Sequence, residues 1–158
     1  MKNILFVCLG NICRSPSAEG VMKAILKREG LETTYFVDSA GTGGWHAGER
    51  ADRRMRKTAA ERGYDLTSLA RQFDPREDFE KFDAIIGMDD ENIRDLRAMD
   101  REGRYGHKIF KMTDFCRKCK ETSVPDPYYG GLHGFEHVLD ILEDACEGLL
   151  DWLLKDER

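Results

Sequence analysis

The sequence predicts a single α/β domain over residues 1–158, in which a four-stranded parallel sheet carries helices on both faces. Two observations support this prediction. Short apolar runs alternate with segments of helical periodicity, and such alternation builds βαβ units with a parallel sheet. A chain of 158 residues also suits one domain, which would bury about two thirds of the surface that the unfolded chain exposes.

Four short segments are predicted to be the strands. Residues 4–7, Ile-Leu-Phe-Val, form a continuous apolar run of the kind found in a buried parallel strand. The second strand is expected at 34–37, ending where Asp-Ser and a glycine-rich turn follow. The third is expected at 84–88 and the fourth at 108–112.

The segments between and after these strands are predicted to be helices. Apolar residues recur at helical spacing from Pro16 to a glycine stop at position 30. Residues 49–62 favour a helix by propensity, and Asp89 is the expected N-cap of a helix that follows the third strand. The clearest amphipathic pattern runs over 134–153.

This order of elements predicts a three-layer sandwich of the flavodoxin-like or Rossmann-like type. In such sheets, ligands bind at the carboxyl ends of the strands near a switch point. The first predicted strand leads directly into Cys8, so the loop after this strand is the first place to look for function.

The loop Cys8–Ser15 has the composition of a phosphate cradle that contains a nucleophile. Its backbone N–H groups and the positive end of the following helix would attract a tetrahedral dianion. The same field favours the reactive thiolate form of Cys8. Arg14 offers a planar fork of donors to two phosphate oxygens. Ser15 is expected to cap the helix and to offer its hydroxyl to the thiolate.

The ten residues Val7–Pro16, VCLGNICRSP, resemble the signature of the low-molecular-weight protein-tyrosine phosphatases. A second segment far along the chain, Asp126-Pro127-Tyr128-Tyr129, resembles the general-acid loop of that family. The length of 158 residues also fits that family, so the resemblance spans nearly the whole sequence. It implies a hydrolase that cleaves phosphotyrosine monoesters through a cysteinyl-phosphate intermediate.

The resemblance implies a role for each of three residues. Cys8 would attack phosphorus while Arg14 and the loop amides hold the equatorial oxygens. Because a tyrosine leaving group has a pKa of about 10, Asp126 would protonate it and would then activate the water that hydrolyses the intermediate. The expected substrate-binding residues are Leu9, Gly10, Asn11, Ile12, Cys13 and Ser15 in the loop, with Trp45, Tyr128 and Tyr129 as aromatic walls.

Three loop residues carry further expectations. Ile12 is aliphatic where the related protein-arginine phosphatases typically have threonine, which favours phosphotyrosine. Asn11 is expected to hold the loop by bonding to the backbone or to Ser39. Cys13 lies five residues from Cys8 on the same loop, so a reversible disulfide between them is a hypothesis.

Three other functions stay open at this point. An arginine phosphatase of related fold is disfavoured by Ile12. A thiol-linked arsenate reductase would need two further spaced cysteines, and Cys116 and Cys119 are the only such pair. A non-catalytic phosphate-binding module would use the cradle without the acid, so the presence of both Cys8 and Asp126 counts against it.

Neither a metal nor an organic cofactor is expected. His133 and His137 match an H-x-x-E-H zinc pattern, but Gly134 weakens the helix there and no third ligand is evident. The C-x2-C pair at 116–119 lacks a second half and is expected to lie in a solvated loop or short helix. Residues 41–46 imitate a dinucleotide fingerprint with histidine in place of the third glycine.

Charge and composition limit the partners and the compartment. The formal net charge of −5 argues against a nucleic-acid binder, so the expected partners are phosphotyrosine-containing proteins, a tyrosine kinase among them, and inhibitory phosphate or other oxyanions. The first apolar run is too short for the core of a signal peptide. The sequence contains no longer apolar run that could span a membrane. Five cysteines without a regular framework favour the reducing cytoplasm.

Overall fold

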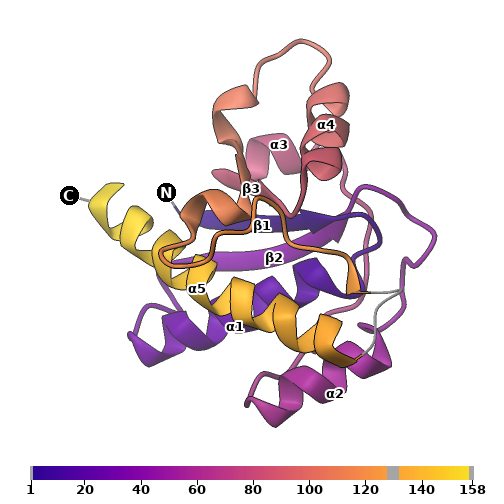
Figure 1. The fold of residues 1–158 in the computed structure, drawn as a ribbon. Helices are drawn as coiled ribbons and strands as arrows, with labels where there is room; N and C mark the ends of the chain where they lie inside the picture. Colours follow the sequence, from indigo (N-terminus) through magenta and orange to yellow (C-terminus); the bar gives the residue numbers. More distant parts are fainter. Residues whose placement is uncertain (1, 128–131, 157–158) are drawn as a thin grey trace.

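The computed structural model describes residues 2–127 and 132–156. Its centre is a four-stranded, all-parallel sheet in the order β2-β1-β3-β4, which confirms the predicted fold class (Figure 1). The strands are β1 (Asn3–Cys8), β2 (Phe36–Gly41), β3 (Ala84–Gly87) and β4 (Ile109–Lys111). Because β1 lies between β2 and β3, the chain leaves the middle of the sheet at Cys8.

Helices cover both faces of the sheet (Figure 1). One face carries α1 (Arg14–Arg28), α2 (Arg53–Glu61) and α5 (Leu132–Asp156), and the other carries α3 (Asp78–Lys81) and α4 (Asp90–Met99). Two short 3-10 turns, η1 (Gly106–Lys108) and η2 (Met112–Phe115), flank β4. Among the described helices, none combines the length and the apolar composition needed to cross a membrane.

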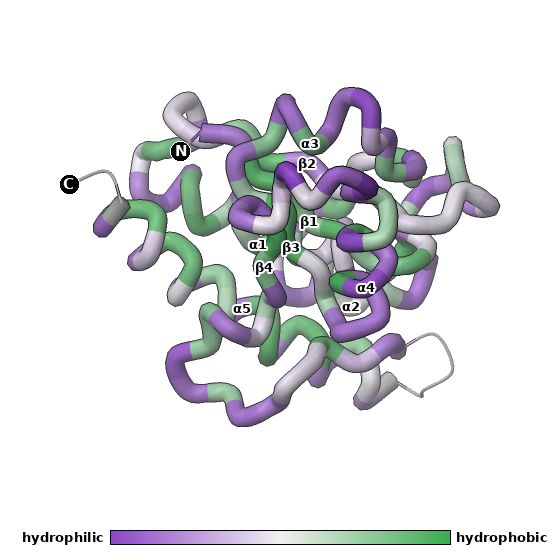
Figure 2. Tube along the Cα trace, turned by 90° about the horizontal axis from the view of Figure 1, so that it is seen from above, coloured by the Kyte–Doolittle hydropathy of each residue, from purple (hydrophilic) through white to green (hydrophobic). Residues whose placement is uncertain are grey.

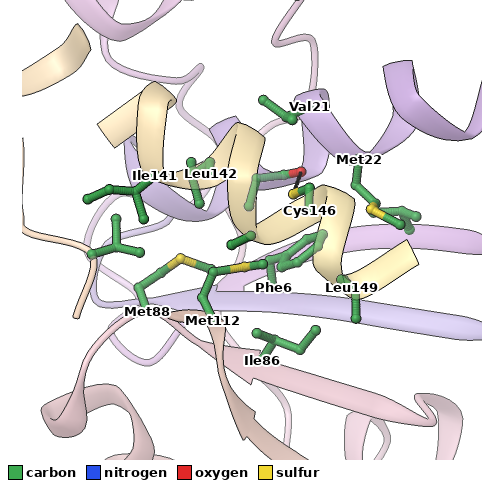
Figure 3. Close-up of a cluster of buried hydrophobic side chains, with 14 of the residues drawn as sticks. Phe6, Val21, Met22, Ile86, Met88, Met112, Ile141, Leu142, Cys146 and Leu149 are labelled. Carbon is green, nitrogen blue, oxygen red and sulfur yellow. Dashed lines mark hydrogen bonds between the residues drawn. The ribbon is translucent and has the colours of Figure 1, made fainter. Parts of the chain in front are cut away.

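The alternation of side chains along β1 divides the interior into two cores. Ile4 and Phe6 pack with α1 and α5 on one face, and Leu5 and Val7 pack with the α3–α4 side on the other. In Figure 2 the central strands are correspondingly green and the outer segments largely purple. Figure 3 shows the larger core, in which Phe6 lies among side chains from α1, α5, β3 and the start of η2.

The second strand differs from its predicted position. The strand was expected at 34–37, whereas β2 runs from Phe36 to Gly41. Ser39 and Ala40 pair with Phe6 and Val7 of β1, so the backbone ladder continues through residues whose polarity suggested a turn. The consequence is functional, because the extension brings Ser39 beside the loop that follows β1.

Capping decides where the helices begin. Asp89 caps α4 as predicted and accepts a hydrogen bond from the Asn92 N–H. The helix expected from residue 49 begins only at Arg53, because the Asp52 carboxylate caps it. The expectation that Ser15 caps α1 was wrong: α1 begins at Arg14, its N-cap is Cys13, and the Ser15 hydroxyl is used elsewhere.

Cys116 and Cys119 lie in a partly exposed loop, as expected, and they form a disulfide that was not expected. The Asp144 carboxylate on α5 explains the pairing, because it accepts hydrogen bonds from the backbone N–H groups of residues 117–119 and folds them into a tight turn. Burial alone would raise the pKa of Asp144, but these three N–H groups outweigh it and lower the pKa. The charged carboxylate is therefore available at neutral pH to hold the turn.

Candidate active site

The carboxyl ends of β1 and β3 meet at one edge of the sheet, and a cleft of about 360 Å³ opens there. Its lining includes most of the predicted site residues: Cys8, Leu9, Gly10, Ile12, Cys13, Arg14, Trp45 and Asp126, together with His46. The predicted residues Tyr128 and Tyr129 lie outside the described residues. The cleft thus brings Asp126 to the same hollow as Cys8, across more than a hundred residues of sequence.

The loop between β1 and α1 presents its backbone N–H groups to the cleft. Three of its carbonyl groups are occupied: those of Cys8, Leu9 and Ile12 accept hydrogen bonds from the N–H groups of residues 42, 43 and 52. By contrast, the N–H groups of residues 10–13 donate to no acceptor within the described part of the chain. Successive unpaired N–H groups before a helix N-terminus form an anion-binding site.

Cys8 lies at the floor of this cradle, 3% exposed, with its Sγ 3.0 Å from the Ser15 Oγ. Ser15 Oγ also accepts a hydrogen bond from Asn11 Nδ2 at 2.8 Å. Its own proton is therefore available for the sulfur, since the other acceptor in reach, the Ala40 carbonyl, is 3.4 Å away. The Ser15 hydroxyl is therefore placed to donate to the Cys8 sulfur.

Arg14 is fixed beside Cys8 by two partners from other elements. Its Nη1 donates to Asp89 Oδ2 at 2.6 Å and to the Val124 carbonyl at 3.1 Å. Burial alone would lower the pKa of the 4% exposed Arg14, but the negative charge of Cys8 and the Asp89 carboxylate outweigh it and raise the pKa. A permanently charged, pre-oriented guanidinium suits bidentate binding of phosphate.

Asp126 lies at the rim of the cleft. Its Oδ2 is 3.8 Å from Nη2 of Arg14, and its side chain is 44% exposed. Two contacts hold the preceding segment: the Val124 N–H donates to the Met88 carbonyl, and the Val124 carbonyl accepts from Arg14. The end of β3 and the Arg14 guanidinium therefore determine where Asp126 stands.

Asn11 keeps the loop in shape through a left-handed backbone conformation, φ 57°. Its Nδ2 donates to the hydroxyls of Ser15 and Ser39, and its Oδ1 accepts from the Arg71 N–H. Ser39 in turn donates to the buried Glu19 carboxylate. The contact between Asn11 and Ser39 agrees with the expectation from the sequence.

Replacing Asn11 with alanine is expected to destabilise the fold by about 2–4 kcal/mol, because buried hydrogen bonds are lost and alanine resists positive φ. Asn11→Gly loses the same bonds without the conformational penalty, so it should be more stable than Asn11→Ala by about 1 kcal/mol. Urea unfolding of the three proteins measures both differences. An alanine variant as stable as the unaltered protein would contradict the holding role.

Two further side chains shape the cleft. Trp45 lies on the loop after β2 and is 68% exposed, so its ring forms a wall rather than part of a core. His46 was not expected from the sequence. It packs so closely that a Cβ at Gly10 would lie 3.0 Å from its Cδ2, and its Nδ1 pairs with Glu49 at 2.6 Å.

Cys13 differs from Cys8 although both thiols are free. Burial raises the pKa of Cys13 well above its usual range, and the negative charges of Asp52 and Cys8 add to this effect. Cys13 is therefore a neutral thiol at physiological pH.

Sequence reasoning missed the second role of Asp89. This residue was predicted only as a helix cap, yet its other carboxylate oxygen orients Arg14. A signal for this role exists in the sequence, since Asp89 follows the third strand just as Cys8 ends the first. Parallel strands bring such residues to the same edge.

The alternative metal motifs do not join this site. His137 pairs with Glu121 at 3.3 Å, away from the cleft lining. Within the described residues, one group of possible ligands comes together, formed by Cys116, Cys119 and Asp144. Its two sulfurs are bonded to each other and its carboxylate is occupied by backbone donors, so this group serves the local turn.

Comparison with known proteins places the chain in one family. The family model described as low molecular weight phosphotyrosine protein phosphatase matches residues 3–158. A protein of Synechocystis sp. whose name assigns it to the low molecular weight protein-tyrosine phosphatases is 51% identical, and the match covers 97% of each chain. A crystal structure of a protein tyrosine phosphatase from Entamoeba histolytica is 50% identical and superposes with a TM-score of 0.95 over 100% of both chains.

The fold alone does not distinguish substrates, since the structure of an arginine phosphatase from Drosophila, 30% identical, also superposes with a TM-score of 0.88 over 97% of this chain and 98% of that chain. The family match over almost the whole sequence is the stronger finding. One cleft thus contains the cysteine at the end of the first strand, the arginine six residues later and a distant aspartate. The chain belongs to the low molecular weight phosphotyrosine protein phosphatases.

Proposed function

We propose that the protein hydrolyses phosphotyrosine on other proteins in two steps, with Cys8 as nucleophile, Arg14 as phosphate clamp and Asp126 as acid and then base. The observation that carries this proposal is the single cleft that all three residues line. The backbone N–H groups of residues 10–13 would bind the phosphate oxygens together with Arg14. A phosphate held in this way would present its phosphorus atom to the Cys8 sulfur.

In the first step, the Cys8 thiolate attacks phosphorus, and the bond between phosphorus and the tyrosine oxygen breaks. Asp126 gives its proton to the departing oxygen, so tyrosine leaves as a neutral phenol. The exposure of the Asp126 side chain, 44%, is consistent with access to a leaving group that points out of the cleft. The enzyme is left with a cysteinyl-phosphate and a carboxylate at position 126.

In the second step, water attacks the cysteinyl-phosphate and gives a proton to the Asp126 carboxylate. The bond between sulfur and phosphorus breaks, and inorganic phosphate is released. Ser15 assists because its hydroxyl can donate to the returning thiolate, as its 3.0 Å separation from the sulfur allows. The acid is then protonated again and ready for another turnover.

The choice of phosphotyrosine over phosphoarginine is supported by side chains at the mouth. Ile12 supplies an apolar surface and no hydroxyl, and Trp45 supplies an aromatic wall. Both suit a phenyl ring better than a guanidine. Leu9 adds a second apolar contact.

A panel of peptides that carry phosphotyrosine, phosphoserine or phosphoarginine tests the proposed specificity. We expect the phosphotyrosine peptide to have the highest kcat/KM, by about a hundred-fold or more, because the acid and the aromatic wall are both used. Ile12→Thr serves as the matched variant and should narrow the gap to phosphoarginine. A phosphoarginine peptide that is preferred by the unaltered protein would establish the second candidate, an arginine phosphatase.

We further propose that the protein acts in the cytoplasm on phosphotyrosine-containing proteins, tyrosine kinases among them. The support for this compartment is that a nucleophilic thiolate needs reducing conditions and that Cys8, Cys13 and Cys146 are free thiols; the Cys116–Cys119 disulfide does not add to it. Phosphate and other oxyanions would occupy the same cradle and act as competitive inhibitors.

A further inference from the structure

A groove leads away from the cleft on the side of Trp45. Leu9 and Trp45, which line the cleft, also line a second hollow of about 490 Å³. Pro75, Met99 and Arg101 are shared between this hollow and a third one of about 560 Å³. We call the second hollow, which borders the cleft, the near hollow and the third one the far hollow; together they are named the side groove.

The wall between the cleft and the side groove is braced. The Trp45 ring packs against the backbone of Gly43, where an added Cβ would lie 1.9 Å from the ring. Gln72 supports the same loop: its Nε2 donates to the Thr42 carbonyl at 3.2 Å, and a Cβ at Gly44 would lie 2.5 Å from its Oε1. An exposed aromatic ring that is held in place in this way offers a firm surface to a bound chain.

The near hollow contains a polar group without a partner. Thr42 lines it, is 8% exposed, and its Oγ1 has no hydrogen-bond partner within residues 2–127 and 132–156. Buried hydroxyls are nearly always paired, but this oxygen is itself covered, so a bound chain would supply a hydrogen-bond partner only after the Thr42 side chain turns toward the hollow. A peptide backbone carries both donors and acceptors at regular spacing and can supply one.

The charges change sign along the side groove. Asp95 lines the near hollow only, whereas Arg101 lines both hollows and the far one also contains Arg76 and Arg104. Among the described residues, Arg101 makes no ion pair or side-chain hydrogen bond. Arg104 reaches its nearest carboxylates only at 3.9–4.0 Å, and the 90% exposed Arg76 side chain pairs with Asp74 at 3.4 Å.

The carboxylates of the far hollow have partners among the described residues, whereas the Arg101 guanidinium has none. Asp100 accepts hydrogen bonds from the N–H groups of residues 104 and 105, so its charge is committed to the turn after α4. Among the described residues, the ion pair of Glu102 is with Arg104, at 3.9 Å. The far hollow therefore favours an incoming carboxylate, although the whole chain has a net charge of −5.

We propose that the side groove binds the peptide segment flanking the phosphotyrosine, and that Arg101 selects a carboxylate in that segment. The inference rests on the proposed function, because the phosphotyrosine must occupy the cleft. The acidic residue belongs in the far hollow, since Asp95 repels a carboxylate closer to the phosphotyrosine. Arg101 is thereby a specificity-determining residue that does not touch the phosphate.

Synthetic phosphotyrosine peptides test this proposal. One glutamate is moved stepwise along an otherwise neutral sequence on each side of the phosphotyrosine, and each peptide is paired with its glutamine counterpart. At low ionic strength, we expect glutamate to raise kcat/KM about three- to five-fold at its best position, which is separated from the phosphotyrosine, and to have no benefit next to it. Arg101→Glu should abolish or reverse this preference.

Arg94→Glu on α4 is the matched control, because it makes the same charge change on an exposed residue outside the side groove. It should retain the glutamate preference, and both variants should hydrolyse p-nitrophenyl phosphate at the rate of the unaltered protein. Equal rates for every glutamate and glutamine pair, or a preference that survives Arg101→Glu, would overturn the inference about the side groove and leave the proposed function intact. An unaltered protein that fails on p-nitrophenyl phosphate as well would overturn the proposed function on which the inference rests.

Discussion

Replacing Cys8 with serine is expected to reduce turnover of aryl phosphates by about 10⁴-fold or more, because the reaction loses its nucleophile. A serine hydroxyl in the same position has neither the charge nor the polarisability of a thiolate. The cradle itself should survive, since the loop carbonyls and Asn11 hold it independently of the sulfur. Steady-state kinetics measures the loss, and calorimetric titration with inorganic phosphate measures the remaining anion binding.

Cys146→Ser is the matched control for this prediction. Cys146 is fully buried in α5, its Sγ donates to the Ala18 carbonyl at 3.9 Å, and neither residue lines the cleft. The same chemical change there should leave kcat within about two-fold, because Cys146 touches no reacting group. A Cys8→Ser protein that turns over as fast as the Cys146→Ser protein would exclude Cys8 as the nucleophile.

Replacing Asp126 with alanine is expected to slow phosphotyrosine hydrolysis by about 10²–10⁴-fold, the usual contribution of a general acid. The loss should depend on the leaving group. Esters of acidic phenols depart without a proton and should be slowed far less than esters of tyrosine. A plot of log kcat/KM against leaving-group pKa should therefore be steeper for the variant than for the unaltered protein.

Two variants accompany this measurement. Asp126→Asn keeps the size of the side chain and should give the same steep dependence. Asp65→Asn changes an exposed carboxylate elsewhere and should keep the slope of the unaltered protein. If every ester is slowed equally by Asp126→Ala, the residue serves phosphate binding or loop structure and not proton transfer.

Local patterns were sufficient to predict the central part of this molecule. The apolar run at 4–7, the loop after it and the Asp89 cap are each determined within a few residues, and the structure contains all three. The position of Asp126 beside Cys8 could not follow from spacing, because the segment before it is held by Met88 and Arg14. It came instead from the resemblance to a family.

Features that depend on contacts between distant segments were missed. The extension of β2 through Ser39 is fixed by pairing with β1, not by the strand propensity of its own residues. Asp89 orients Arg14 only because two parallel strands end at the same edge. The Cys116–Cys119 disulfide needs Asp144 from α5 to fold its turn, and the side groove exists only where α4 lies beside the loop that carries Trp45.

The most direct test of the proposed mechanism is to capture its intermediate. The Asp126→Ala protein is mixed with p-nitrophenyl phosphate, quenched within the first turnovers, digested and examined by mass spectrometry, with the Cys8→Ser protein as the blank. The mechanism predicts a rapid release of one nitrophenol per enzyme and a phosphoryl group on the Cys8 peptide. A steady release without a burst, or phosphate found on another residue while Cys8 remains a free thiol, would contradict it.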